Sequence, residues 1–134
     1  MNIYAFYSVN GEITNIYTGT QPEMQTGFAY INCGIEVNDT LYYIPDTASP
    51  VPTAKPTNPT TIDKTTVIAD GVDKITLSSI PLNSTIDLTG DHISPIQDTA
   101  TSSTIDFTFD VTGTYNLKVD LFPYLPFEAV INAN

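Results

Sequence analysis

The sequence has few cationic residues and few of the side chains that build metal or catalytic centres. Its 134 residues include four lysines, no arginine, one histidine and one cysteine, against fifteen acidic residues, and the formal net charge is −11. Binding to nucleic-acid phosphates or to anionic membrane surfaces requires clustered cations, so we expect neither partner. The single cysteine, Cys33, excludes an internal disulfide and a cysteine metal cluster, and we interpret it as a small buried apolar residue.

Long apolar segments are also missing. No apolar run approaches the roughly 18 residues that a membrane-spanning helix requires. The first residues, MNIYAFYSVNG, contain no basic leader, no long apolar core and no small-residue cleavage site, which are the marks of a secretory signal. We therefore expect a soluble chain that is not exported.

The sequence offers little evidence for a catalytic or metal-binding site. His92 is the only histidine, and its neighbours Asp91 and Asp98 do not supply the partners of a nucleophilic triad or a zinc site. Calcium takes six to eight oxygen ligands, but no segment matches a calcium-binding loop. We interpret the acidic residues as solvated side chains on outer faces, and we predict no enzyme, no cofactor and no metal site. The acids considered for calcium are Asp70, Asp73, Asp87, Asp91, Asp106 and Asp110.

The segment 45–61, PDTASPVPTAKPTNPTT, is rich in proline and threonine. Its five prolines lie two to five residues apart, and Val51 is its only large apolar side chain. Proline cannot donate a backbone hydrogen bond, so such a segment neither continues a helix nor pairs inside a sheet. We predict an extended, exposed linker between two small modules, ordered only where a neighbouring subunit covers it.

Residues 1–44 are expected to form a small β-rich docking module. Two runs of aromatic and β-branched residues, 3–9 and 12–18, flank Asn10-Gly11, which favours a type I′ hairpin turn with positive φ at both positions. Both faces of the first run are apolar, so the hairpin needs cover. The many tyrosines of this module fit either a thin core or a binding platform. The other expected elements are one helical turn at 22–26 and short strands at 28–32, 34–37 and 41–44.

Residues 62–134 show the period-two alternation of β-strands. The clearest case is TIDFTFDV, residues 104–111, where Ile105, Phe107, Phe109 and Val111 share one face. A run of about six short strands without helical periodicity predicts an all-β fold, here an immunoglobulin-like β-sandwich. Its core must consist of aliphatic and phenylalanine packing, because tryptophan and a cysteine pair are missing. The other strands are expected at 65–69, 74–78, 85–89, 114–121 and 127–131, with a polar loop at 91–103.

Two segments of the C-terminal module, DKTTVIADGVDKITLSSIP and FDVTGTYNLKVDLFPYLPFEAVINA, resemble the bacterial immunoglobulin-like domains of tailed-phage virion proteins. The N-terminal segments IYAFYSVNGEITNIYTG and YYIPD resemble the short β-rich modules that begin phage tail-fibre and tail-fibre-assembly proteins. The resemblance covers most of the chain except the linker. It implies a virion location after assembly in the host cytoplasm, and it carries no catalytic motif.

The function that this resemblance implies is that of a non-enzymatic structural component associated with a phage tail or fibre. Its partners would be other virion proteins in many copies, and contact with the host surface is left open. Capsid decoration, tail-fibre assembly and host-glycan binding remain alternatives. The expected docking residues on the N-terminal hairpin are Ile3, Tyr4, Phe6, Tyr7, Ile16 and Tyr17. The expected contact residues on an exposed loop are Phe122 and Tyr124.

Overall fold

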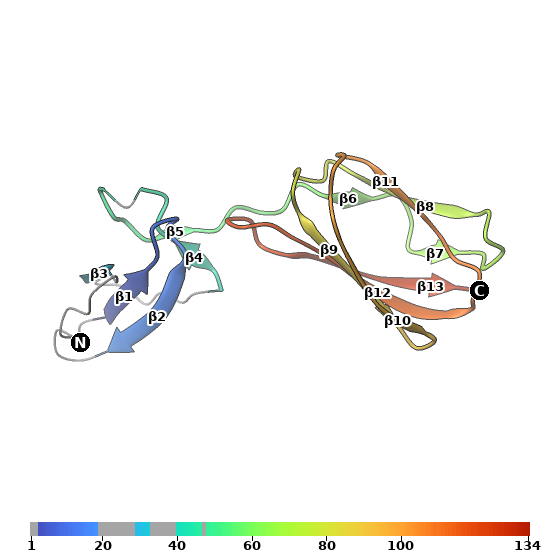
Figure 1. The fold of residues 1–134 in the computed structure, drawn as a ribbon, viewed down its shortest axis with the longest axis horizontal. Helices are drawn as coiled ribbons and strands as arrows, with labels where there is room; N and C mark the ends of the chain where they lie inside the picture. The colour runs from blue at the N-terminus through green and yellow to red at the C-terminus, as the bar shows by residue number, and fades with distance from the viewer. Residues whose placement is uncertain (1–2, 19–28, 33–39, 47) are drawn as a thin grey trace. The chain divides into compact units, whose positions relative to one another are not determined.

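The computed structural model describes residues 3–18, 29–32, 40–46 and 48–134, and every regular element in these ranges is a β-strand (Figure 1). The all-β prediction is therefore confirmed. The chain divides into two compact units, Met1–Pro56 and Thr57–Asn134. Within these ranges there is no helix of the length and apolar character needed to cross a membrane. Cys33, the expected helical turn at 22–26 and the expected strand at 34–37 lie outside the described residues.

The N-terminal unit contains two small antiparallel sheets. The first has three strands in the order β2-β1-β3, and the second pairs β4 with β5. Ala5, Tyr7, Ile13 and Ile44 form its core, and Tyr42 packs against them. The strands are β1 (Ile3–Tyr7), β2 (Ile13–Thr18), β3 (Ala29–Asn32), β4 (Tyr42–Tyr43) and β5 (Thr53–Ala54).

The β1–β2 hairpin forms as predicted, but its turn is longer than the expected two residues. The N–H of Gly11 donates to the carbonyl of Ser8 at 3.0 Å, and only Gly11 of the Asn10-Gly11 pair has positive φ, at +87°. A turn followed by a glycine of positive φ is the usual three-residue hairpin loop, and it adds a bulge to the ladder. Val9, which we expected in the first strand, instead lies in this turn and is 96% exposed.

Residues 45–61 differ from the predicted linker. The β5 strand pairs with β4, and the N–H of Lys55 donates to the carbonyl of Leu41 at 2.7 Å. Asn58 is buried, and its side-chain amide donates to the carbonyl of Val119. The donors of these bonds are residues that lie between the prolines. Unlike proline, they have a backbone N–H group or a polar side chain that can donate. The described part of the segment is thus divided between the two units, and its residues form hydrogen bonds within the chain.

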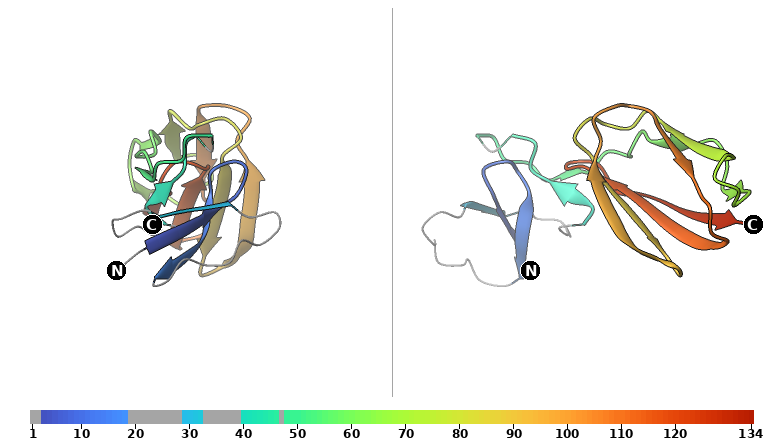
Figure 2. Two further views of the ribbon diagram at one scale, coloured as in Figure 1. Left: turned by 90° about the vertical axis from the view of Figure 1, so that its left-hand side faces the viewer. Right: turned by 45° about the vertical axis from the view of Figure 1, so that its right-hand side comes forward.

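The C-terminal unit is a β-sandwich of two sheets. The five-stranded sheet has the order β10-β9-β12-β13-β7, and the three-stranded sheet has the order β11-β8-β6. Figure 2 shows the two sheets as separate layers in its right-hand view. The strands are β6 (Thr61–Ile62), β7 (Thr66–Val67), β8 (Lys74–Ser78), β9 (Thr85–Gly90), β10 (Ile93–Thr99), β11 (Ile105–Thr108), β12 (Gly113–Asp120) and β13 (Phe127–Ala133).

The strand order is that of an immunoglobulin-like sandwich, as the sequence predicts. Each sheet combines strands from both halves of the unit. The chain changes sheets on either side of β7, between β8 and β9, and on either side of β11. The first strand of the five-stranded sheet, β7, pairs parallel with the last, β13. The polar loop expected at 91–103 is wrong in part, because β10 lies within it and pairs with β9.

Buried side chains from both sheets meet in one core. On β12, the buried residues Tyr115, Leu117 and Val119 alternate with Asn116 and Lys118, which is the pattern of a strand that has one face covered. Each fully buried aliphatic side chain stabilises the fold by about 1.5–3 kcal/mol. Val111 was expected on the buried face, but it lies beyond the end of β11 and is 39% exposed. The core residues are Val67, Ile75, Leu77, Ile80, Ile86, Leu88, Ala100, Phe109, Tyr115, Leu117, Val119, Ile131 and Ala133.

Tyr115 ties the start of β12 to the turn before it. Its hydroxyl donates to the backbone carbonyl of Val111 at 2.7 Å, and its ring packs against Phe109 with centroids 4.6 Å apart. A tyrosine with this hydrogen bond at the equivalent corner is a hallmark of immunoglobulin-like sandwiches. Tyr115 therefore fixes the corner between Phe109 and the start of β12.

We expect Tyr115→Phe to lower the free energy of unfolding of the sandwich by about 0.5–1.5 kcal/mol, because the hydrogen bond to the carbonyl of Val111 is lost. Urea denaturation of the full chain, followed by circular dichroism, measures the change. Tyr124→Phe is the matched control, since Tyr124 is only half-buried and its hydroxyl has no hydrogen-bond partner among the described residues. Equal stability of the two variants would contradict the role of Tyr115.

Candidate interaction surfaces

The expected docking residues of the N-terminal hairpin lie on different surfaces. Tyr4 and Tyr7 are each only 6% exposed, and Tyr7 belongs to the core cluster of the N-terminal unit. The side chains of these two tyrosines are therefore covered within the unit and do not contribute to an accessible docking surface. Phe6 is half-buried. Ile3 begins β1, and its side chain lies outside the described part of the chain.

The outward part of the expected docking surface lies on β2. Ile16 is 36% exposed and Tyr17 is 46% exposed. Residues on β2 pair with β1 on one side, with Ile16 opposite Ala5 and Tyr17 opposite Tyr4. On its other side, β4 reaches only the start of β2, where Glu12 forms an isolated bridge with Tyr43. From Thr14 to Thr18 that side of β2 has no strand partner among the described residues, because β2 ends the order β2-β1-β3. Unpaired backbone groups of this kind can accept an added strand.

The expected contact loop, residues 121–126, joins β12 to β13. The N–H of Tyr124 donates to the carbonyl of Leu121 at 2.8 Å and closes a turn. Phe122 and Tyr124 are both half-buried in this turn. Neither side chain is the fully exposed aromatic that a flat binding platform requires.

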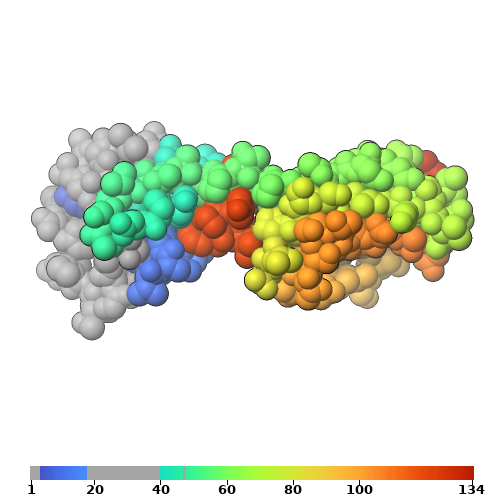
Figure 3. Space-filling model, turned by 90° about the horizontal axis from the view of Figure 1, so that it is seen from above, coloured from blue at the N-terminus to red at the C-terminus, as the bar shows by residue number. Residues whose placement is uncertain are grey.

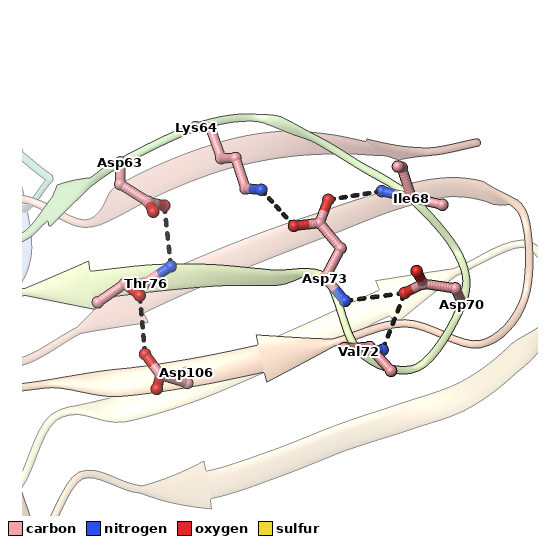
Figure 4. A network of polar contacts seen from close by, with 8 residues as sticks. All are labelled: Asp63, Lys64, Ile68, Asp70, Val72, Asp73, Thr76 and Asp106. Atoms are coloured by element: carbon pink, nitrogen blue, oxygen red, sulfur yellow. Dashed lines mark hydrogen bonds and ion pairs between the residues drawn. The ribbon is translucent and has the colours of Figure 1, made fainter.

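Two acidic residues at the turn between β7 and β8 accept hydrogen bonds from nearby backbone N–H groups. Asp70 accepts hydrogen bonds from the N–H groups of Val72 and Asp73, at 2.9 and 2.8 Å (Figure 4). Asp73 pairs with the Lys64 ammonium at 2.6 Å and accepts from the N–H of Ile68 at 2.9 Å. These bonds stabilise the ionised carboxylates, so the pKa values of Asp70 and Asp73 lie below the ordinary 3.8.

A second part of this network crosses the outer face of the three-stranded sheet, in which β8 lies between β6 and β11. Figure 3 views the C-terminal unit from the side of this sheet. Asp63 accepts from the N–H of Thr76 at 2.8 Å, and the hydroxyl of Thr76 donates to Asp106. The other oxygen of Asp106 pairs with the Lys74 ammonium at 2.9 Å, which, with the Thr76 bond, lowers the pKa of Asp106. In the described ranges no group of three or more acidic, histidine or cysteine side chains is placed to hold a metal ion.

The lowered pKa values predict a loss of stability in acid. A carboxyl whose pKa is depressed by folding stabilises the native state above its unfolded value of 3.8, and this contribution disappears as the pH falls through the lower folded value. We expect Asp73→Asn to reduce the fall in urea midpoint between about pH 5 and about pH 2. Asp110→Asn is the control, because Asp110 has no side-chain partner among the described residues, and it should leave the acid-induced fall unchanged. An unchanged fall in Asp73→Asn would contradict the contribution of this carboxylate.

No protein-family model, curated protein or solved structure matches this chain. The interaction surfaces therefore have to be interpreted from their own geometry. Sequence reasoning found the exposed half of the hairpin, at Ile16 and Tyr17, because both lie in a β-branched and aromatic run. It missed the structural use of Asp70 and Asp73, although an aspartate two or three residues before a backbone N–H in a turn is a common signal for such a bond.

Proposed function

We propose that this chain is a non-enzymatic structural component of a tailed-phage virion, associated with the tail or a fibre. The N-terminal unit anchors the chain on a larger assembly, and the immunoglobulin-like unit is displayed. The observation that supports anchoring is the open edge of β2, which carries exposed Ile16 and Tyr17. The sequence resemblance to phage virion modules supports the location.

The edge strands of the sandwich are guarded against pairing, whereas β2 is not. Proteins protect exposed edges with short strands, charges, prolines and bulges. The edges β6 and β7 have two residues each, β11 carries Asp106, and β10 contains Pro95 and a register shift between Ile93 and Ile96. The β2 strand, ITNIYT, is six residues long and has neither a charge nor a proline.

Docking by strand addition fits these features. An extended segment of the partner would pair with the backbone of β2, and pockets on the partner would receive Ile16 and Tyr17. Among the described residues, the core cluster of the N-terminal unit consists of four buried residues, and we expect added strands to contribute to the stability of so small a sheet. The displayed unit needs no such partner, because its core is continuous across both sheets.

The location is tested by electron microscopy of purified phage particles in which the C-terminus of this chain carries a gold-binding tag. We expect label at repeated positions on the tail or fibres. Label on the head would support capsid decoration instead, and particles without label would contradict a virion location.

The anchoring mode is tested by placing a charge on the open edge. Ile16→Lys should reduce co-sedimentation of the purified chain with particles that lack it by at least about tenfold, because lysine is a natural guard of edge strands. Ile96→Lys is the matched control, since Ile96 is 54% exposed on β10, an edge strand of the sandwich. Equal co-sedimentation of both variants would rule out anchoring through β2.

A further inference from the structure

The outer face of the five-stranded sheet contains a groove that the proposed function does not use. The groove has a volume of about 470 Å³ and is lined by residues of three adjacent strands, β9, β12 and β13. Small-molecule sites in proteins commonly have volumes of about 300–1,000 Å³. The side chains that matter for recognition are Asp87, Thr89, Asn116, Lys118, Glu128 and Val130.

The strand register arranges these side chains in two rows across the groove. In the first row, Lys118 lies opposite Asp87 on one side and opposite Glu128 on the other. This row therefore alternates negative, positive and negative charge, with neighbouring strands about 4.8 Å apart. In the second row, Asn116 lies between Thr89 and Val130. The groove thus presents charged groups beside an amide, a hydroxyl and an aliphatic side chain.

Most of these polar groups are not used within the protein. The other lysines of the sandwich, Lys64 and Lys74, form ion pairs with aspartates. Lys118 forms neither an ion pair nor a hydrogen bond with any residue in the described ranges, and the same is true of the Glu128 carboxylate. Asp87 accepts one hydrogen bond, from the Nε2 of Gln97 at 2.9 Å, and keeps further acceptor positions.

The polar side chains on the outer face of the three-stranded sheet differ from those in the groove. There, the ammonium of Lys74, the hydroxyl of Thr76 and the carboxylate of Asp106 satisfy one another. Polar groups on one outer face of the sandwich therefore bond to one another, while Lys118 and Glu128 in the groove have no side-chain partner in the described ranges.

The charge pattern selects the chemical class of this ligand. A cationic ligand would meet Lys118, and an anionic ligand would meet two carboxylates as well as the field of a chain of net charge −11. A neutral ligand with adjacent hydroxyl groups fits all of the groups, because each hydroxyl both donates and accepts. It can donate to Asp87 and Glu128 and accept from Lys118, while its C–H surface contacts Val130. We infer that the groove on β9, β12 and β13 is a binding site for a neutral saccharide.

The site is tested by titrating the isotopically labelled full chain with glucose, galactose and N-acetylglucosamine, and with linear oligosaccharides of each, while recording amide chemical shifts. Each sugar is taken to about 50 mM, since a shallow site with few contacts binds weakly. We expect saturable shifts for at least one sugar, confined to β9, β12 and β13. Stronger binding of the oligosaccharide than of its monosaccharide would identify a polymer as the source of the ligand, and equal binding would identify the free sugar.

Two variants locate the site. Lys118→Met and Glu128→Gln should each weaken the binding at least about tenfold, because each removes a charged partner of the ligand hydroxyls. Lys74→Met is the matched control and should bind as the parent does, since Lys74 lies on the opposite sheet. Absence of saturable shifts for every sugar would overturn the inference, as would binding that persists in both groove variants or maps to Phe122 and Tyr124. None of these outcomes affects the test of anchoring through β2.

Discussion

Leu117→Ala is expected to lower the free energy of unfolding of the sandwich by about 2–5 kcal/mol. Leu117 is 1% exposed in the middle of β12, the strand that pairs with both β9 and β13. Its truncation removes apolar contacts and leaves a cavity that two sheets held by backbone hydrogen bonds cannot close. The loss is a large part of the roughly 5–15 kcal/mol that stabilises a typical domain.

Urea denaturation of the full chain measures this effect as a fall in the midpoint of the transition that belongs to the sandwich. With a slope of about 1–3 kcal/mol per molar urea, the fall should be at least about 0.7 M. Leu82→Ala is the matched control, because Leu82 is 57% exposed in the turn between β8 and β9, and its effect should stay within about 0.5 kcal/mol. A similar midpoint for the two variants would mean that β12 is not central to the core.

Gly11→Ala is expected to disrupt the N-terminal unit while the sandwich stays folded. Gly11 has a φ of +87°, and its carbonyl accepts a hydrogen bond from the N–H of Ile44 at 2.7 Å. A Cβ at this position would overlap the carbonyl oxygen of Ile44, which is backbone and cannot move without breaking this bond. Because Ile44 is one of the four core residues of this unit, the disruption should spread beyond the turn.

Amide chemical shifts of the full chain resolve the two units separately. In Gly11→Ala, resonances of β1, β2 and β4 should lose their dispersion, while those of β8, β9 and β12 should not move. Gly71→Ala is the matched control, since Gly71 also has positive φ, +74°, but an added Cβ would meet no atom within 4 Å. It should cost only about 1 kcal/mol, the usual penalty of this conformation for alanine. If both variants behaved alike, the close approach of Gly11 to Ile44 would be refuted.

Strands with a clear alternation could be predicted from the sequence because their two faces have different environments. The expected strand 74–78 matches β8 residue for residue, and the expected strand 114–121 differs from β12 by one residue at each end. The β10 strand was missed since six of its seven residues are exposed and one of them is Pro95, so no alternation marks it. Backbone pairing with β9 defines this strand, and such pairing leaves no pattern in the sequence of β10 itself.

Contacts between distant residues also explain the errors around the prolines and the tyrosines. Proline content correctly signals that no long strand crosses 45–61, but it does not reveal that Asn58 would be buried against Val119, 61 residues away. Likewise, the run containing Tyr4 and Tyr7 predicts a strand with two apolar faces without saying which face the rest of the unit covers. Tyr7 is buried in the same cluster as Ile44, which is distant from Tyr7 in the sequence.

The two-layer sandwich, the small N-terminal unit and the open edge of β2 together favour a chain that is anchored at one unit and displayed at the other. The groove on the five-stranded sheet would give the displayed unit a ligand, and the network around Asp73 and Asp106 would keep the opposite face rigid and occupied by its own contacts. Anchoring and saccharide binding are separable, because they rest on different strands and on different residues.

The central claim is that the chain is a structural component of the mature virion. Mass spectrometry of phage particles purified through two density gradients tests it most directly. We predict peptides from both units at a constant ratio to a known tail protein, in every particle fraction. Peptides found in the infected-cell lysate but missing from purified particles would contradict the claim and would identify an assembly factor instead.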